Sequence, residues 1–289
     1  MRRVAIVGLG LIGGSLGLGL KRYLPGVAVM GVARRRESAD EAVAMGAVDA
    51  AGTDLSALAE ADLVVLACPL AVTAAVLEDA IPHLAEGARV TDVGSTKSVV
   101  VEHAVRALDQ ARNPFLGGHP MAGKEASGIG HADPDLFRGR PWVFTPHVVG
   151  AAEPFEDFLN AVRAIGAVPL NLAPDQHDRY VALVSHVPFL LSAAYLLSVG
   201  RDPDWADAAE LASSGFRDIS RLGAGNSEMY AAITSFNREE VLRAWQSLHQ
   251  ALDMFEAAMA RGEDPMLLDL LVTARAIRDG WAADHPEPG

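Results

Sequence analysis

The chain has 289 residues, half of them hydrophobic, which is enough for one large or two medium hydrophobic cores. Its formal net charge of −13 argues against a nucleic-acid-binding protein, because phosphate recognition needs a basic face. Cys68 is the single cysteine, so no disulfide can form within the chain, and a reducing cytoplasm is the expected compartment.

The first predicted element is a short buried strand at residues 4–7, followed by a glycine motif and then by helical spacing. Gly8 permits a tight turn, Gly10 lets the backbone approach a pyrophosphate, and Gly13 lets the helix pack against the strand. The helix directs its unpaired N–H groups at the phosphates. A strand before the motif and a helix after it predict a dinucleotide site.

The residues after the second predicted strand (28–32) bear on the choice of cofactor. In many NAD-binding proteins an acidic residue here holds the ribose 2′-hydroxyl. This chain has Arg34, Arg35 and Arg36 instead, and a guanidinium can bind a 2′-phosphate through paired hydrogen bonds. A solvated charge cluster is the alternative, although the helix dipole disfavours cations at a helix start. The sequence favours NADP and leaves NAD open.

Strand and helix signals alternate up to about residue 172. Further strands are predicted at residues 63–67, 89–93, 114–117, 142–145 and 168–172, and helices at 38–45, 72–84, 98–111 and 153–165. This alternation is typical of a doubly wound α/β domain with a mainly parallel sheet. We therefore expect a Rossmann-type domain over residues 1–173.

After about Pro174 the strand signals stop. Helices are predicted at residues 175–199, 204–221, 227–234, 238–261 and 265–281, with Gly/Pro breaks at 200–203 and 262–265. The sequence thus predicts an all-helical second domain over residues 174–289, with no further domain after it.

Two apolar segments imitate membrane-directed sequences. The N-terminal run follows Arg2 and Arg3, but it is broken by glycines and lacks a convincing cleavage site, so we do not interpret it as a signal peptide. Residues 180–199 carry no Asp, Glu, Lys or Arg and could span a bilayer. Because they include His186 and Pro188, and no comparable segment follows, we expect a helix buried in protein and no membrane partner.

Five motifs stand out in chain order: GLGLIGGS at 8–15, DVGSTK at 92–97, GGHPMAGKEASG at 117–128, SHVPF at 185–189 and FRDISRLGAGNSEMY at 216–230. In this order and at these separations, the chain resembles the prephenate/arogenate dehydrogenase family of tyrosine biosynthesis over essentially its whole length. The resemblance implies NAD(P)-dependent oxidative decarboxylation of prephenate to 4-hydroxyphenylpyruvate. It also implies a Rossmann domain followed by a helical domain that forms a homodimer.

The resemblance implies catalytic roles for His119 and Ser95. His119, expected in a loop after a strand, would take the proton of the substrate hydroxyl, a task that suits neutral imidazole. Ser95 would hydrogen-bond the same hydroxyl and orient His119; by itself, Ser95 is better explained as a helix cap. Lys97 stays unassigned between a structural role and the substrate carboxylate.

Substrate recognition is expected in the helical domain. Arg217 and Arg221 are four residues apart and share a helical face, which a doubly anionic ligand or neighbouring acidic residues would explain. The matching motif implies that Arg221 binds the ring carboxylate. It also implies that His186 contacts the substrate side chain or the product, and that Tyr230 lines the pocket across the dimer. Pro188 predicts a helix kink beside His186.

Two positions depart from the family pattern. Relatives commonly carry Ser or Thr where this chain has Lys124, whose charge favours prephenate over arogenate if it faces the pocket. They commonly carry a second His where this chain has Phe189, which leaves side-chain recognition and tyrosine inhibition open. The expected cofactor-binding residues are Gly8, Gly10, Leu11, Ile12, Gly13, Arg34, Arg35, Cys68, Pro69 and Ser95, and no metal is expected.

Three other functions remain to be distinguished from prephenate dehydrogenase. Arogenate dehydrogenase differs only in the substrate side chain. A β-hydroxyacid dehydrogenase has a similar layout, but it relies on a lysine in the first helix of its second domain, and residues 175–199 contain none. A nucleotide-sensing Rossmann protein without catalysis would not need a pocket that joins His119, Ser95 and Arg221.

Overall fold

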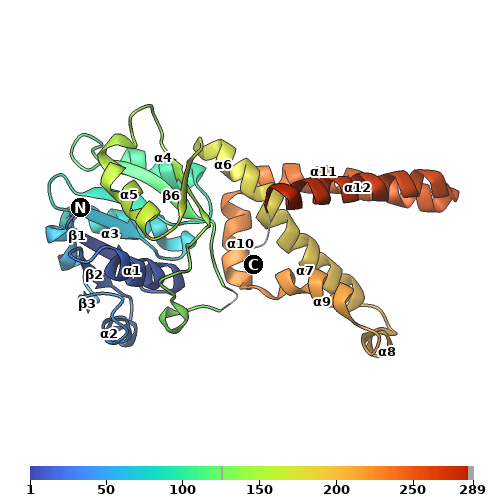
Figure 1. Cartoon of the computed structure of the whole chain (residues 1–289), viewed down its shortest axis with the longest axis horizontal. Coiled ribbons are helices and arrows are strands. Elements are labelled where there is room, and N and C mark those ends of the chain that lie inside the picture. The colour runs from blue at the N-terminus through green and yellow to red at the C-terminus, as the bar shows by residue number, and fades with distance from the viewer. Residues whose placement is uncertain (125, 286–289) are drawn as a thin grey trace. The chain divides into compact units, whose positions relative to one another are not determined.

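The computed structural model describes residues 1–124 and 126–285 (Figure 1). Its strands are β1 (Arg3–Val7), β2 (Ala28–Val32), β3 (Ala50–Gly52), β4 (Leu63–Leu66), β5 (Arg89–Asp92), β6 (Phe115–Pro120), β7 (Pro141–Thr145) and β8 (Val168–Asn171). They form one sheet in the order β3-β2-β1-β4-β5-β6-β7-β8. Neighbouring strands are parallel except β6 and β7, which are antiparallel.

Helices connect the strands and then continue alone. Those in the sheet-bearing part are α1 (Leu11–Tyr23), α2 (Arg36–Ala44), α3 (Thr73–Ala80), α4 (Ser98–Ala107) and α5 (Glu156–Ala164). After β8 they are α6 (Pro174–Val181), α7 (Val187–Val199), α8 (Trp205–Ala209), α9 (Ser214–Arg221), α10 (Ser227–Phe236), α11 (Arg238–Arg261) and α12 (Asp264–Asp284). The predicted order, an α/β part followed by a helical part, is confirmed.

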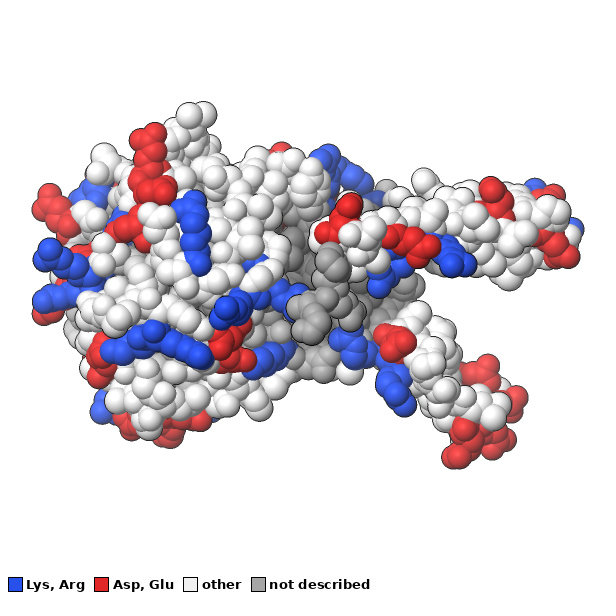
Figure 2. Space-filling model, in the orientation of Figure 1, with Lys and Arg blue, Asp and Glu red and all other residues white. Residues whose placement is uncertain are grey.

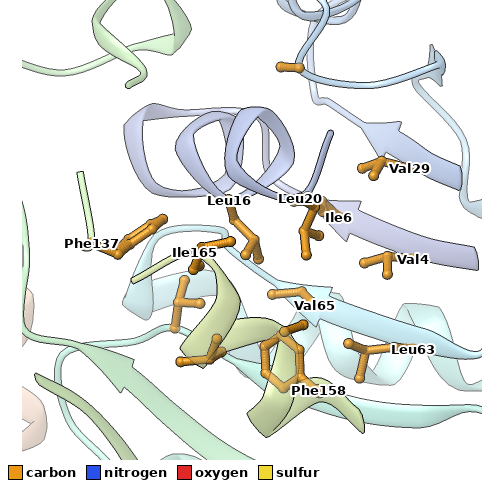
Figure 3. Close-up of a cluster of buried hydrophobic side chains, with 14 of the residues drawn as sticks. Val4, Ile6, Leu16, Leu20, Val29, Leu63, Val65, Phe137, Phe158 and Ile165 are labelled. Carbon is orange, nitrogen blue, oxygen red and sulfur yellow. The ribbon is translucent and has the colours of Figure 1, made fainter. Parts of the chain in front are cut away.

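Both faces of the central strands are covered. Val4 and Ile6 of β1 belong to a hydrophobic cluster with side chains of α1, α2 and α5, part of which Figure 3 shows. Ala5 and Val7 point the other way, into a second cluster with side chains of α3, α4 and α10. Burial on both sides explains why these strands are continuous apolar runs in the sequence. The arrangement is doubly wound, as predicted.

The strand order reverses beside β1, which lies between β2 and β4. In open α/β sheets, ligands bind at such a switch point, outside the carboxyl ends of the strands. The glycine motif follows β1, residues 67–69 follow β4, and residues 93–97 follow β5. The predicted cofactor and catalytic loops therefore share one edge of the sheet.

Two predicted helices were wrong in extent, and one strand was missed. The helix expected at 98–111 ends at Ala107, since Asp109 accepts the N–H of Ala111 (3.0 Å) in a local turn that competes with the helix. The helix expected at 204–221 is two helices, α8 and α9, separated at Ser213, whose backbone is extended. The sequence analysis missed β3, which is too short to give an alternating pattern.

His119 lies within β6 and not in a loop after it. The strand was expected to end at Gly117, but pairing with β7 continues through His119 opposite Val143 and Pro120 opposite Trp142. On the other side, the ladder with β5 stops at Leu116. His119 is therefore placed by a paired strand, which holds its backbone more firmly than a loop would.

Packing divides the chain into two compact units, Met1–Arg238 and the residues from Glu239 onward, which comprise most of α11 and all of α12. In the first unit α10 packs on the sheet-bearing part, and Ile233 belongs to the cluster with α3 and α4. Residue 174 thus marks the end of the strands and not a gap in packing. The boundary at 173/174 stays a prediction.

Among the described residues, Pro174–Val199 is the one helical run long and apolar enough to cross a membrane. A third of its most apolar window (33%) is buried. His177 and Asp178, just before the apolar segment 180–199, are buried against the sheet-bearing part. Because most of the segment itself is not buried in this chain, a helix buried in protein stays a prediction. The irregularity expected near Pro188 takes the form of a π-helical turn at Ala182–His186.

Charged side chains are mixed over the face that Figure 2 shows. Lys and Arg alternate with Asp and Glu on the sheet-bearing part and do not form one basic stripe, and acidic side chains gather around α8.

Candidate active site

The turn after β1 has room only for glycine at two positions. Gly8 has φ +106°, and a Cβ there would lie 2.5 Å from the carbonyl oxygen of Ala67. A Cβ on Gly13 would lie 2.0 Å from the carbonyl oxygen of Gly8. These contacts bring the turn against the end of β4, as the sequence motif requires.

The start of α1 fits the phosphates of a dinucleotide. Gly10 is the N-cap of α1, no side chain caps it, and the first turn contains no acidic residue. A Cβ on Gly10 would meet nothing within 4 Å in the described structure, so the space before the helix is open. Leu11 and Ile12 form the first turn, and their N–H groups suit an anion.

The other predicted cofactor residues lie around this turn. Cys68 is partly buried, and its Sγ lies 3.7 Å from the hydroxyl of Thr73 at the start of α3; Pro69 beside it is exposed. Arg34 and Arg35 are exposed after β2, the strand next to β1. Arg36 pairs with Asp40 within α2 (3.1 Å). Of these three arginines, Arg34 and Arg35 make no ion pair with the residues that the structure describes.

A chain of three side chains ends at His119. His119 Nδ1 lies 2.8 Å from His177 Nε2, and His177 Nδ1 lies 2.8 Å from Asp178 Oδ1. His177 is fully buried and Asp178 nearly so, whereas His119 is partly exposed. In the described structure, Nε2 of His119 makes no hydrogen bond and is not sealed from solvent. Nε2 is therefore the ring nitrogen left for a ligand.

The carboxylate of Asp178 also caps α4. Its Oδ1 accepts the N–H of Lys97 (2.7 Å) and its Oδ2 the N–H of Ser98 (2.8 Å). Interpreting Ser95 as the cap of this helix is therefore wrong, because a residue 80 positions away supplies the acceptor. Ser95 stays partly exposed in the loop between β5 and α4. Its role toward the substrate stays a prediction.

Burial and neighbouring charges determine the protonation of His119 and Asp178. Burial, with His177, Lys97 and His186 nearby, holds the pKa of His119 well below 6.5, so His119 is neutral at pH 7. Burial alone would raise the pKa of Asp178, but hydrogen bonds from His177 and from the N–H groups of Ser98 and Lys97 hold that pKa below its usual value. His119 is thus a neutral imidazole that is linked through His177 to the ionised carboxylate of Asp178.

A buried ion pair holds the backbone beside His119. Lys97 and Asp92 are completely buried and hydrogen-bonded to each other. The Lys97 ammonium also donates to the carbonyl of Gly118 (2.8 Å), while Asp92 accepts the N–H of Gly118 (3.1 Å) and of Gly94 (2.8 Å). Both sides of the Gly118 residue are therefore fixed. A Cβ on Gly118 would lie 2.7 Å from the carbonyl oxygen of Asp92.

His186 lies next to the hydrogen-bond chain formed by His119, His177 and Asp178. It is buried, and burial lowers its pKa to about 4, against the opposing effect of Asp178. Its Nδ1 lies 3.3 Å from the side-chain nitrogen of Asn237, which donates to the carbonyl of Asp178 (2.8 Å). His186 therefore packs beneath the site, and a contact with substrate stays a prediction.

The remaining predicted substrate residues lie on separate elements. Arg217 and Arg221 share α9, as expected, and both are exposed. Tyr230 stacks on Phe189, with ring centroids 3.5 Å apart, so it packs within its own chain. Lys124 forms an ion pair with Asp133 (3.0 Å), which balances its charge. Their contacts with a substrate stay predictions.

The sequence analysis missed three buried residues, Asp92, His177 and Asp178, and left the buried Lys97 unassigned. His177 and Asp178 stand together at positions where a helix was predicted, and a charged pair ahead of an apolar run could have drawn attention to them. Asp92 is a charged residue at the end of a buried strand, just before the loop that carries Lys97, and this position is a weaker indication of a functional role. Nothing in the spacing shows that these two segments meet.

A dinucleotide-type turn and a neutral histidine at the same edge of a sheet define the class of protein: a nicotinamide-dependent dehydrogenase. Two family models cover most of the chain, the nucleotide-binding domain of prephenate dehydrogenase at residues 16–170 and its dimerization domain at residues 173–273. The chain belongs to the prephenate dehydrogenase family.

Relatives agree with this assignment. Prephenate dehydrogenase of Bacillus subtilis is 30% identical over 280 residues, which span 96% of this chain and 75% of the relative. The crystal structure of Synechocystis arogenate dehydrogenase is 36% identical with a TM-score of 0.85, covering 97% of this chain and all of the other. That of prephenate dehydrogenase from Aquifex aeolicus, in complex with hydroxyphenyl propionate and NAD+, is 27% identical with a TM-score of 0.90, covering 97% and 98%.

Proposed function

We propose that this protein is a prephenate dehydrogenase, which converts prephenate to 4-hydroxyphenylpyruvate and carbon dioxide with a nicotinamide cofactor. The observation that carries the proposal is the neutral His119 with an unpaired Nε2, at the edge of the sheet where the glycine turn lies. The family assignment and the likeness to prephenate dehydrogenases agree with it.

His119 acts as the base. Its Nε2 takes the proton of the ring hydroxyl while the carbon that bears this hydroxyl loses hydride. The bound cofactor supplies the hydride acceptor, and the residues of the glycine turn would hold its pyrophosphate. Ser95 orients the hydroxyl from the neighbouring loop. His119 later returns the proton to the oxygen of the product, so the reaction releases no net proton.

Arg221 positions the substrate through its ring carboxylate. This grip holds the ring so that its hydride faces the nicotinamide. It does not itself speed the loss of carbon dioxide, because it stabilises the carboxylate that has to leave. Once the hydroxyl carbon is oxidised, the electrons of the breaking carbon–carbon bond enter the ring, and aromatisation drives decarboxylation.

The assay with prephenate tests this proposal. The purified protein with prephenate and NADP+ should form reduced cofactor and carbon dioxide in equal amounts, and NAD+ and arogenate serve as the comparison cofactor and substrate. Turnover of arogenate alone would make the enzyme an arogenate dehydrogenase, the activity named for the Synechocystis relative. No turnover with any of the four combinations would overturn the enzyme proposal.

The cofactor preference is proposed to be NADP. Arg34 and Arg35 are exposed beside the glycine turn and can bind a 2′-phosphate. Replacing both with Gln should lower the ratio of kcat/KM for NADP to that for NAD by about 10- to 100-fold, the size of lost charge-assisted hydrogen bonds. Arg36→Gln, which removes the partner of Asp40, is the matched control. An unaltered ratio in the double variant would refute the preference.

Arg221→Ala should mainly weaken substrate binding. The loss of a charge-assisted contact with the ring carboxylate should cost about 2–4 kcal/mol and raise KM for prephenate by roughly 30- to 1000-fold. Arg201→Ala, in the exposed turn after α7, is the control and should leave KM unchanged. If KM is the same in Arg221→Ala, the guanidinium does not bind substrate.

The helical part, residues 174–289, is proposed to form a homodimer. The family model that matches residues 173–273 describes a dimerization domain. Large apolar side chains are exposed along α12, among them Leu268, Leu271, Val272 and Ile277. An exposed apolar stripe on a helix is expected where a second copy packs. We place the enzyme in the cytoplasm and expect no nucleic-acid or membrane partner.

A further inference from the structure

The hydrogen-bond chain behind His119 has only one direction in which every donor meets an acceptor, if Asp178 is ionised and both histidines are neutral. An ionised carboxylate can only accept, so His177 must donate from Nδ1. A neutral His177 then has a lone pair on Nε2, which must receive a hydrogen from Nδ1 of His119. This leaves Nε2 of His119 without hydrogen.

We propose that His177 and Asp178 are positioning residues for the reaction, which hold His119 in the tautomer with hydrogen on Nδ1, so that the unprotonated Nε2 meets the substrate hydroxyl. The role of Nε2 toward the substrate rests on the proposed function. When Nε2 takes the substrate proton, the imidazolium keeps its Nδ1–H bond to His177, and the carboxylate beyond stabilises the new charge.

The surroundings keep Asp178 in the required state. Its two oxygens accept the N–H groups of Lys97 and Ser98 as well as the ring of His177. Among the residues that the structure describes, the other charged or titratable groups near His119 are Lys97, Asp92 and His186. The Lys97 ammonium is bonded to Asp92 and to the Gly118 carbonyl, so it makes its hydrogen bonds away from Asp178.

The carboxylate of Asp178 thereby serves two parts of the site. Through His177, its neighbour in α6, Asp178 sets the tautomer of His119. Asp178 also fixes the start of α4, directly after the loop that carries Ser95. The base and the serine are thus placed by the same group. This explains why a buried carboxylate, costly in itself, stands at the junction of α4 and α6.

Asp178→Asn removes the ionised acceptor at the end of the chain. Oδ1 accepts both the N–H of Lys97 and the ring of His177, and Oδ2 accepts the N–H of Ser98, so an amide cannot satisfy all three donors in either orientation. The amide therefore no longer fixes which ring nitrogen of His177 carries hydrogen, and His119 loses its single tautomer and the carboxylate that stabilises its charged form. This loss should lower kcat by on the order of 100-fold, with KM for prephenate and cofactor nearly unchanged.

The direct readout is the ¹⁵N NMR spectrum of the full-length protein labelled at histidine, with the His119 signals assigned through His119→Asn. In the wild type, Nε2 of His119 should resonate as an unprotonated ring nitrogen and Nδ1 as a protonated one. In Asp178→Asn this single-tautomer pattern should be lost. A protonated Nε2 in the neutral wild-type ring would overturn the proposal, whether or not the protein turns over prephenate.

Two more variants separate tautomer from folding. His177→Phe keeps the Asp178 cap on α4 but breaks the chain, so kcat should again fall while the thermal unfolding midpoint changes less than in Asp178→Asn. Asp54→Asn alters a different cap, on Ser56 N–H (2.9 Å), and should leave kcat unchanged. If wild-type turnover is present and His177→Phe retains full kcat, the positioning role is wrong. If wild-type turnover is absent, the proposed function fails instead.

Discussion

His119→Asn should lower kcat for prephenate by about 10³-fold, within the range attributed to a general base, and leave KM within a few-fold of the wild type. Asn fills similar space and can still donate to His177, but it cannot take a proton. The effect should fall on kcat because the hydroxyl proton moves in the transition state, whereas we propose that Arg221 holds the substrate. Steady-state kinetics with varied prephenate at saturating NADP+ measures both constants.

The pH dependence of kcat/KM provides the control for this interpretation. A base is active when unprotonated, and burial holds the pKa of His119 well below 6.5. The acidic fall in kcat/KM should therefore lie below pH 6.5 and be missing from the residual activity of His119→Asn. Equal kcat in the two proteins would remove His119 as the base.

Lys97→Met should destabilise the protein by about 3–5 kcal/mol, the cost of leaving a buried charge without its partner. Asp92 is fully buried, and Met fills the space of the lysine chain without replacing its ammonium. The carbonyl of Gly118 loses its donor as well. Urea unfolding followed by circular dichroism, at one fixed protein concentration, gives the free energy of unfolding.

Two further variants test whether the burial of the Lys97–Asp92 pair causes the loss of stability. Arg106→Met breaks an exposed pair with Glu102, whose side chains are 71% and 66% exposed, and should cost at most about 1 kcal/mol. Adding Asp92→Asn to Lys97→Met removes the unpaired charge and should restore part of the stability. A Lys97→Met protein as stable as Arg106→Met would show that the pair does not hold the strand.

The sequence was sufficient for the architecture because the signals there are local. Strand β1, Gly8 and Gly13 predict a dinucleotide turn from residues that are neighbours in the chain. Long apolar runs predict strands buried on both faces. The position of His119 was predicted less well, since the pairing of β6 with β7 that extends the strand depends on residues more than twenty positions later.

The buried polar residues of the site depend on contacts that no spacing reveals. Ser95 is well placed to cap α4, and only the structure shows that Asp178, 80 residues beyond Ser98, supplies the acceptor. The same holds for His177, which reaches His119 across 58 positions. The sequence motifs predicted His119 as the base, but the contacts that we propose to fix its tautomer become visible only when the helix after β8 packs against the sheet.

The most direct test of the account is a crystal structure with NADP+ and 4-hydroxyphenylpyruvate, whose phenolic oxygen marks the place of the substrate hydroxyl. The account predicts that His119 Nε2 lies within hydrogen-bond reach of this oxygen, at about 2.6–3.2 Å. A product bound with its oxygen away from His119, or with another side chain at that distance, would contradict it.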